Sequence, residues 1–238
     1  MSHRHRRAER EVAETLEMKL EGVDRGSRTD AGYDPLTLRT SRGTIESRYY
    51  PAAPASEAVI YVGGVGGGFD TPVRGGLYPR LCSRFQQEGI SGLRVAYRHS
   101  TALLEATLDV LAGVAFLERE GIRKVGLVGW SLGGAAVVQA ASLSERVRTV
   151  VTIATQSYGI EPARELGPRC SILLLHGKAD QTMPIHCSEF GFEIAREPKE
   201  LLLHEYANHG LDQWGDEVVD LIHDWLRDQL RRPSDRRQ

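Results

Sequence analysis

The chain has 238 residues, of which 41% are hydrophobic and 26% are charged, a composition typical of a soluble globular protein and not of a disordered one. The 30 Lys and Arg residues against 32 Asp and Glu residues give a net charge of −2, which excludes a global attraction to nucleic acid or to anionic lipid. No apolar stretch reaches the ~18 residues of a membrane span, and no apolar run follows the basic N-terminus, which argues against a secretory signal.

From residue 36 onward, short apolar strands alternate with helices. Before that point the chain is polar, and only Val12, Leu16, Met18 and Leu20 offer one loose helix face. The predicted strands are Leu36–Thr40, Thr44–Tyr50, Ala58–Val62, Ser91–Tyr97, Lys124–Val128, Arg148–Ala154, Ser171–His176 and Glu200–Tyr206. The predicted helices lie near Tyr78–Phe85, at Thr101–Glu120, Leu132–Leu143 and Ile185–Arg196, and around Val218–Leu226. This alternation predicts an α/β fold with a parallel sheet of about eight strands and helices on both faces, about six in all.

The sharpest motif is Gly129-Trp130-Ser131-Leu132-Gly133, between the strand Val125–Val128 and the helix that begins at Leu132. A serine on such a strand–turn–helix connection is a nucleophile elbow. The turn is so tight that side chains two residues before and after the serine would collide with backbone, and glycine removes the collision. The helix N-terminus adds positive potential and free N–H groups. The motif predicts Ser131 as a catalytic nucleophile.

A nucleophilic serine needs a base, and the base needs a group that orients it. Between Ser131 and His209 the only aspartate is Asp180, which follows the predicted strand Ser171–His176. His209 follows the next predicted strand. Because catalytic groups gather at the carboxyl ends of parallel strands, we expect all three side chains at one edge of the sheet.

The third requirement is an oxyanion hole, in which two backbone N–H groups stabilise the negative oxygen of the tetrahedral intermediate. One donor is expected to be the amide of Leu132, and the other an amide of the glycine-rich segment Gly63–Gly68. Val65 is the first choice for that second donor and Gly66 the second choice. Gly64 and Trp130 are expected to contact the substrate. A phosphate-binding loop is the alternative, but Phe69 breaks the GxGxxG pattern and no GK[ST] follows.

Other polar residues carry weaker signals. The His204–His209 spacing is one residue too long for the HExxH zinc motif, so we expect no metal site there. His176 is expected to support the segment that carries Asp180, and His186 and His223 to be surface or cap residues. Arg98 and His99 end a strand near the same edge, where either substrate contact or salt bridging is open.

The cysteines are few. Cys82, Cys170 and Cys187 are widely spaced and odd in number, which argues against a disulfide framework or a zinc ribbon and favours a reducing cytoplasmic location. Cys82 and Cys187 occupy ordinary helical positions.

These motifs resemble the α/β-hydrolase superfamily, in particular its small, lidless branch of dienelactone-hydrolase-like proteins and carboxylesterases. The resemblance covers about residues 36–230. Gly129–Gly133 matches the family elbow, His176–Asp180 followed by Met183-Pro184 its acid loop, and Asn208–Gly210 its histidine loop. The family pattern often has His-Gly where Gly63-Gly64 stands here. Dienelactone hydrolases use a cysteine nucleophile, so Ser131 moves the expected substrate from a lactone towards an ester or thioester.

The resemblance implies an α/β-hydrolase domain over residues 34–231, with a partly ordered polar extension at 1–33 and a polar tail at 232–238. Its sheet would be mostly parallel, and the interval Thr155–Arg169 is too short for a helical lid.

The expected function is hydrolysis of a small-molecule carboxylic ester or thioester through an acyl-enzyme, with no metal or cofactor. Two alternatives stay open. One is a non-catalytic binding protein of the same fold, and the other is the same triad used as a peptidase, acyltransferase or perhydrolase. The oligomeric state is not predicted.

Overall fold

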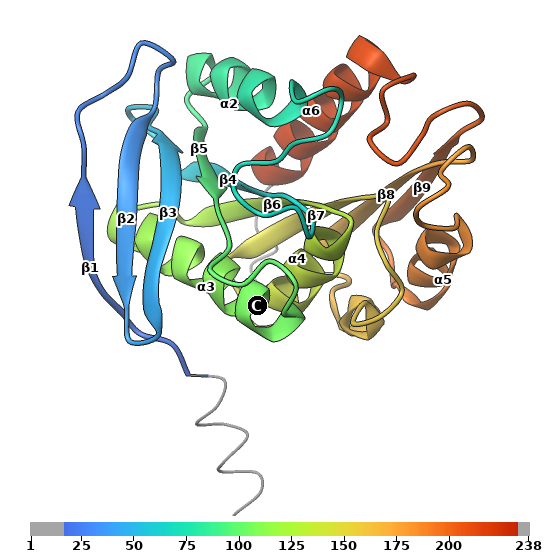
Figure 1. Ribbon diagram of the computed structural model, residues 1–238, viewed down its shortest axis with the longest axis horizontal. Coiled ribbons are helices and arrows are strands. Elements are labelled where there is room, and N and C mark those ends of the chain that lie inside the picture. Colours follow the sequence, from blue (N-terminus) through green and yellow to red (C-terminus); the bar gives the residue numbers. More distant parts are fainter. Residues whose placement is uncertain (1–16, 233–238) are drawn as a thin grey trace, which may run out of the picture.

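The structure, a computed structural model, describes residues 17–232 and contains a nine-stranded sheet covered by helices (Figure 1). The strands are β1 (Leu20–Arg25), β2 (Asp34–Thr40), β3 (Gly43–Tyr50), β4 (Glu57–Val62), β5 (Ser91–Val95), β6 (Lys124–Trp130), β7 (Val147–Ile153), β8 (Ser171–Gly177) and β9 (Lys199–His204). The α-helices of the described part are α2 (Leu77–Gln87), α3 (Leu103–Arg119), α4 (Leu132–Ser142), α5 (His186–Ile194) and α6 (Gly215–Arg231).

The strand order is β1-β2-β3-β5-β4-β6-β7-β8-β9. Strands β1, β2, β3 and β5 pair antiparallel, whereas β5, β4, β6, β7, β8 and β9 are parallel to one another. The predicted fold class, a mostly parallel α/β sheet with helices on both faces and no large lid, is confirmed.

The strand order reverses direction at β4. After β4 the chain builds β5 on one side of it and then returns to build β6 on the other side. In open parallel sheets the crevice outside the carboxyl ends of the strands at such a reversal is where ligands bind. The segments that follow β4 and β6 are the glycine-rich loop and the Ser131 turn, so the topology places both at this crevice.

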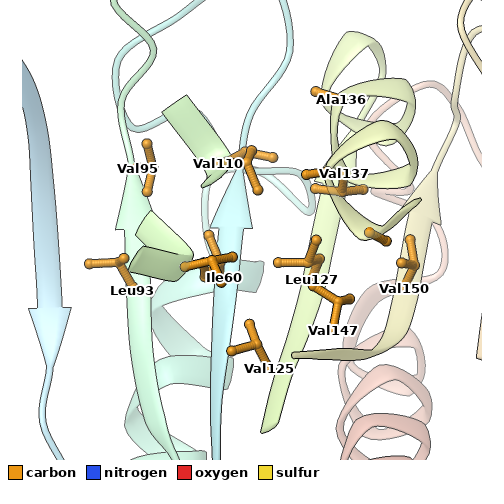
Figure 2. Close-up of a cluster of buried hydrophobic side chains, with 14 of the residues drawn as sticks. Ile60, Leu93, Val95, Val110, Val125, Leu127, Ala136, Val137, Val147 and Val150 are labelled. Carbon is orange, nitrogen blue, oxygen red and sulfur yellow. The ribbon is translucent and has the colours of Figure 1, made fainter. Parts of the chain in front are cut away.

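Two hydrophobic layers cover the sheet. Helices α2 and α6 lie on one face, and α3, α4 and α5 lie on the other (Figure 1). Figure 2 shows part of the second layer, where side chains of the central strands meet α3 and α4. It labels Ile60, Leu93, Val95, Val110, Val125, Leu127, Ala136, Val137, Val147 and Val150. Each large aliphatic side chain removed from water contributes roughly 1.5–3 kcal/mol, and this layer supports the carboxyl edge from below.

The residue pattern of the individual elements explains this burial. Strand β4 is apolar on both faces, and all of Ala58–Val62 are buried, as expected for a central parallel strand. Helix α6 buries Val218, Ile222 and Leu226 on one stripe and exposes charged residues elsewhere.

The N-terminal region differs from expectation. Leu20 lies in strand β1, which pairs antiparallel with β2, and not on a helix face with Val12, Leu16 and Met18. Val12 and Leu16 lie outside the described residues. Strand β1 is held by backbone pairing at the sheet edge and has only one buried side chain, so its sequence shows no strand periodicity. Strand β1 is the ninth strand, one more than the sequence predicts. It lies before residue 34, where the predicted domain begins, and that boundary stays a prediction.

Candidate active site

Ser131 occupies a strained turn between β6 and α4. Its φ of 56° and ψ of −119° lie in a region that residues with a Cβ rarely adopt. Its backbone N–H donates to the carbonyl of Ile153 at 2.8 Å, and its carbonyl accepts from the N–H of Gly134 at 3.0 Å. The turn is therefore fixed to β7 on one side and to helix α4 on the other. Ser131 is 8% exposed, so the residue is largely enclosed.

The two glycines that flank Ser131 are sterically required. A Cβ on Gly129 would lie 2.1 Å from the carbonyl oxygen of Gly133, and a Cβ on Gly133 would lie 2.3 Å from the carbonyl oxygen of Gly63. Both distances are far below a normal van der Waals contact. The helix can begin directly under the serine only because these two positions carry no side chain.

Asp180 and His209 are joined directly. His209 Nδ1 donates to Asp180 Oδ2 at 2.7 Å. Asp180 Oδ1 accepts the backbone N–H groups of Thr182 at 2.7 Å and Met183 at 2.9 Å. The Asp180 side chain is inaccessible to solvent, whereas the His209 side chain is 19% exposed. The carboxylate is thus held from several directions, and among residues 17–232 only Nδ1 of the imidazole has a hydrogen-bond partner.

The loops that carry Asp180 and His209 are connected by backbone bonds. Lys178 N–H donates to the carbonyl of His204, and Ala179 N–H donates to the carbonyl of Ala207. A Cβ on Gly177 would lie 2.0 Å from that same Ala207 oxygen, so glycine is needed for this close approach. The two loops are therefore packed against each other and joined by hydrogen bonds at the carboxyl ends of β8 and β9.

Trp130 links this pair to the Ser131 turn. Its Nε1 donates to the carbonyl of His209 at 2.8 Å, and the two rings lie 5.4 Å apart between centroids. Within the described part of the chain the Ser131 hydroxyl makes no hydrogen bond. The structure therefore brings Asp180 and His209 into direct contact and connects Ser131 to them through its neighbour Trp130.

A second histidine lies against Asp180. His176 is completely buried, and its Nε2 lies 2.9 Å from the carbonyl of Met183 and 3.2 Å from Asp180 Oδ2. Its Nδ1 lies 2.7 Å from Ser188 Oγ. Since both neighbours of Nε2 are acceptors, Nε2 carries the proton and Nδ1 accepts from the hydroxyl. Burial lowers the pKa of His176, so the ring is neutral.

The glycine-rich segment after β4, residues 63–68, is called the glycine loop below. A Cβ on Gly64 would lie 3.2 Å from Ser131 Cβ and 3.7 Å from its Oγ, so the loop passes beside the serine. Gly64 accepts from the N–H of Gly67 at 3.3 Å, and Val65 accepts from Ser100 Oγ at 2.9 Å. Because C=O and N–H of a trans peptide point in opposite directions, these two bonds set the directions of the next N–H groups, those of Val65 and Gly66.

The backbone N–H groups of Val65 and Leu132 donate to no acceptor in residues 17–232. Leu132 is the first residue of α4, where an N–H has no intrahelical partner. Both groups are free to bind a ligand.

Comparison with solved structures places this architecture. Est1E from Butyrivibrio proteoclasticus superposes with a TM-score of 0.70 at 13% identity, over 83% of this chain and 99% of its own. A dienelactone hydrolase from Anabaena variabilis superposes with a TM-score of 0.68 at 19% identity, again over 83% and 99%. An esterase from Pyrococcus furiosus gives a TM-score of 0.70 at 15% identity, over 87% and 97%. The chain has the α/β-hydrolase fold.

Sequence comparison adds no further relative. No protein-family model matches the chain, and no curated protein matches it either. The α/β-hydrolase fold was nevertheless readable from the sequence, because its elbow and its two loops are short local motifs.

Between β7 and β8 the chain forms only the short 3-10 helix η1 (Glu161–Glu165), and the expected absence of a helical lid over residues 155–169 fits this. No helix in residues 17–232 is long and apolar enough to cross a bilayer, and no three potential metal ligands gather in that range.

The other polar residues considered in the sequence lie in salt bridges, at the surface or between packed helices. Arg98 is a salt-bridging residue, with Nε 2.5 Å from Asp109 Oδ1 and a terminal nitrogen 2.8 Å from Glu105 Oε2. His99 is exposed, as is His186. His223 is 1% exposed, so the expectation of a surface or cap residue is wrong. It stacks on Phe85 and lies 2.7 Å from Glu88 Oε1, because α6 packs against α2.

The cysteines lie inside the protein. Cys82, Cys170 and Cys187 are all buried and unpaired. Burial raises the pKa of the Cys170 thiol to about 12 and raises that of Cys82 further. Neither of these two thiols can supply a thiolate nucleophile near neutral pH.

Two residues that contact the glycine loop or the residue directly after it were not singled out from the sequence. Ser100 binds the Val65 carbonyl, and Arg94 donates to the carbonyl of Phe69. Neither belongs to a motif, because each reaches the loop from a distant part of the chain.

Proposed function

We propose that this protein is a serine hydrolase that cleaves a carboxylic ester or thioester through an acyl-enzyme intermediate. The observation that carries the proposal is the hydrogen-bonded Asp180–His209 pair, bound through Trp130 to a serine on a strained, glycine-flanked turn. An α/β-hydrolase fold alone would not support it, since that fold also occurs in proteins of other functions.

The first step is attack of Ser131 Oγ on the substrate carbonyl carbon. His209 Nε2, the free nitrogen of the ring, takes the hydroxyl proton, and the C–O bond to the enzyme forms as the carbonyl π bond breaks. Asp180 holds His209 through Nδ1–H and stabilises the imidazolium. The four contacts on the Asp180 carboxylate keep it oriented for this role.

The negative oxygen of the tetrahedral intermediate is bound by the N–H groups of Leu132 and Val65. Gly66 is the second choice for the loop donor. Each such donor is worth on the order of 3 kcal/mol in the transition state. Val65 is favoured because it follows Gly64, which lies against Ser131.

Collapse of the intermediate expels the alcohol or thiol, which takes its proton from His209. Water then attacks the acyl-enzyme, with His209 as the base, and releases the acid and free Ser131. Gly64 and Trp130 border the reacting carbonyl and form part of the substrate surface.

Substrate class is argued from the surroundings of the site. Because η1 is the only helix between β7 and β8, small or surface-accessible esters are favoured over long-chain lipids. Est1E has also been solved with ferulic acid bound, and two further similar structures are esterases. These likenesses support ester substrates over peptides. The three free cysteines favour a reducing, cytoplasmic location.

The test is hydrolysis of p-nitrophenyl esters of increasing acyl length by wild type and Ser131→Ala. We expect turnover by wild type and a fall in kcat of roughly 10⁴–10⁶ in the variant. An unchanged melting temperature would show that the variant is folded. A variant that kept most of its turnover would contradict the mechanism, and an inactive but folded wild type would favour a binding protein.

A further inference from the structure

The glycine loop cannot hold its own shape. Five of its six residues are glycine, which has the largest conformational freedom of any residue. Its internal bonds are long, 3.3 Å from Gly67 N–H to Gly64 and 3.4 Å from Asp70 N–H to Gly67. An oxyanion donor must nevertheless be held in place before the reaction, because its contribution comes from preorganisation. The loop must therefore be fixed by contacts from outside.

Two side chains bind the loop and the residue that follows it, while Tyr78 binds the carbonyl of Val62 directly before it. Ser100 Oγ donates to the carbonyl of Val65 at 2.9 Å. The guanidinium of Arg94, on β5, donates to the carbonyl of Phe69, directly after the loop. The Ser100 bond orients a peptide inside the loop, and the Arg94 bond fixes the point at which the chain leaves it.

The buried charge of Arg94 lowers the stability of the fold. Its residue is 4% exposed, and its Nε has no hydrogen-bond partner within the described chain. No carboxylate in residues 17–232 pairs with it. Its neighbours Tyr50 and Cys82 do not balance the charge, because burial raises the pKa of each and keeps both neutral. A buried charge without a counter-charge destabilises the folded state. The stability of the fold therefore does not explain why an arginine occupies this position.

A second arginine adds to this cost. Arg48 on β3 is the direct cross-strand partner of Arg94, and like charges directly opposite each other are destabilising. Both guanidinium groups lie over the ring of Phe69, with the Arg48 guanidinium carbon 4.0 Å and the Arg94 guanidinium carbon 5.6 Å from the ring centroid. Both cations therefore contact Phe69: each guanidinium lies over its ring, and Arg94 also binds its carbonyl. The two unfavourable charges thus lie at the residue that directly follows the glycine loop.

We propose that Arg94, assisted by Ser100, is a positioning residue that fixes the glycine loop so that the N–H group of Val65 or Gly66 faces the developing oxyanion. The proposal rests on the proposed function. Arg94 does not touch the substrate, and its effect is transmitted through the Phe69 carbonyl. It should therefore act on the transition state and leave ground-state binding unchanged.

The test compares Arg94→Met and Arg94→Lys with Arg148→Met as the matched control. Arg148 also lies in a strand and also has a buried Nε without a partner, but it is near the amino end of β7, far along the strand from the site edge. kcat and KM are measured with a short p-nitrophenyl ester, with the active fraction counted by burst titration. The inhibition constant of a trifluoromethyl ketone, which forms a tetrahedral adduct with serine, is measured on the same samples.

For Arg94→Met we expect kcat to fall by roughly 10–100-fold with KM within about twofold of wild type. The inhibition constant should rise by the same factor as kcat falls. Arg94→Lys, which retains a positive donor, should recover part of kcat, and Arg148→Met should behave as wild type. Wild-type kcat in Arg94→Met, or an equal loss in Arg148→Met, overturns the proposal.

If Arg94→Met does not fold, Ser100→Ala carries the test, because its hydrogen bond lies at the surface. Loss of that one bond should lower kcat about 2–10-fold at constant KM, and an unchanged kcat overturns the proposal. A wild type that shows no turnover contradicts the proposed function instead, so the two failures are distinguishable.

Discussion

His176 Nε2 lies 3.2 Å from Asp180 Oδ2, and both side chains are completely buried. The same carboxylate oxygen accepts from His209, so Asp180 lies between one histidine that faces the crevice and one that faces the interior. Because burial keeps His176 neutral, it donates a hydrogen bond to Asp180 without neutralising the carboxylate, whose charge stabilises His209 in the proposed mechanism.

The buried histidine predicts a pH-dependent stability. The folded-state pKa of His176 is lowered below the ordinary value of 6.5, so below that pH the unfolded chain binds more protons than the folded one. Stability is full above about pH 6.5 and is lost as the pH falls. His176→Gln retains an N–H donor and cannot be protonated, so it should lack this component. Urea unfolding of both proteins from about pH 7.5 to 5 should therefore show that the free energy of unfolding falls more steeply with decreasing pH in wild type. The same pH dependence in both proteins would exclude the explanation.

The tight turn at Ser131 predicts that one added methyl group lowers the stability of the fold. Gly129→Ala places a Cβ 2.1 Å from the Gly133 oxygen, and overpacking of this kind typically costs about 1–3 kcal/mol. The serine should also be displaced, so turnover should fall. Gly26→Ala is the control, because its Cβ would meet Pro35 only at an ordinary 3.5 Å. Equal unfolding free energies for both variants would argue against the steric account.

Strain at Ser131 predicts an inverted order of stability. Glycine normally destabilises a position relative to alanine by about 0.5–1 kcal/mol, but at a φ of 56° and ψ of −119° the Cβ is the unfavourable element. Ser131→Gly should therefore be more stable than Ser131→Ala. Thermal unfolding of the two variants decides the point, and the usual order, with alanine more stable, would mean that the turn is unstrained.

The cysteines should be irrelevant to turnover. Because Cys82 is buried and burial raises its pKa, Cys82→Ala should hydrolyse esters at the wild-type rate. Thiol reagents should modify the native protein slowly and the urea-unfolded protein fast. A strong loss of activity in Cys82→Ala, without loss of fold, would point to a thiol in the chemistry.

Local motifs made much of this protein predictable. The Ser131 turn depends on five consecutive residues, and the central strands are continuous apolar runs, so sequence alone located both. Strand β1 was missed because only Leu20 of its six residues is buried. Its conformation comes from pairing with β2, a contact that leaves no periodic pattern.

Tertiary contacts account for the other failures. His223 was expected to be a surface or cap residue, yet the packing of α6 on α2 encloses it beside Phe85. Arg94 carried no signal either, since its bond to Phe69 spans 25 residues and depends on the pairing of β5 with β4. Such contacts follow from the assembled sheet and not from spacing along the chain.

Covalent labelling of Ser131 tests the central claim most directly. Wild type and Ser131→Ala would be exposed to a fluorophosphonate, and the intact mass of each measured. The account predicts one adduct per chain on wild type, because His209 activates the hydroxyl, and none on the variant. No adduct on folded wild type, or an equal adduct on Ser131→Ala, would contradict an activated Ser131.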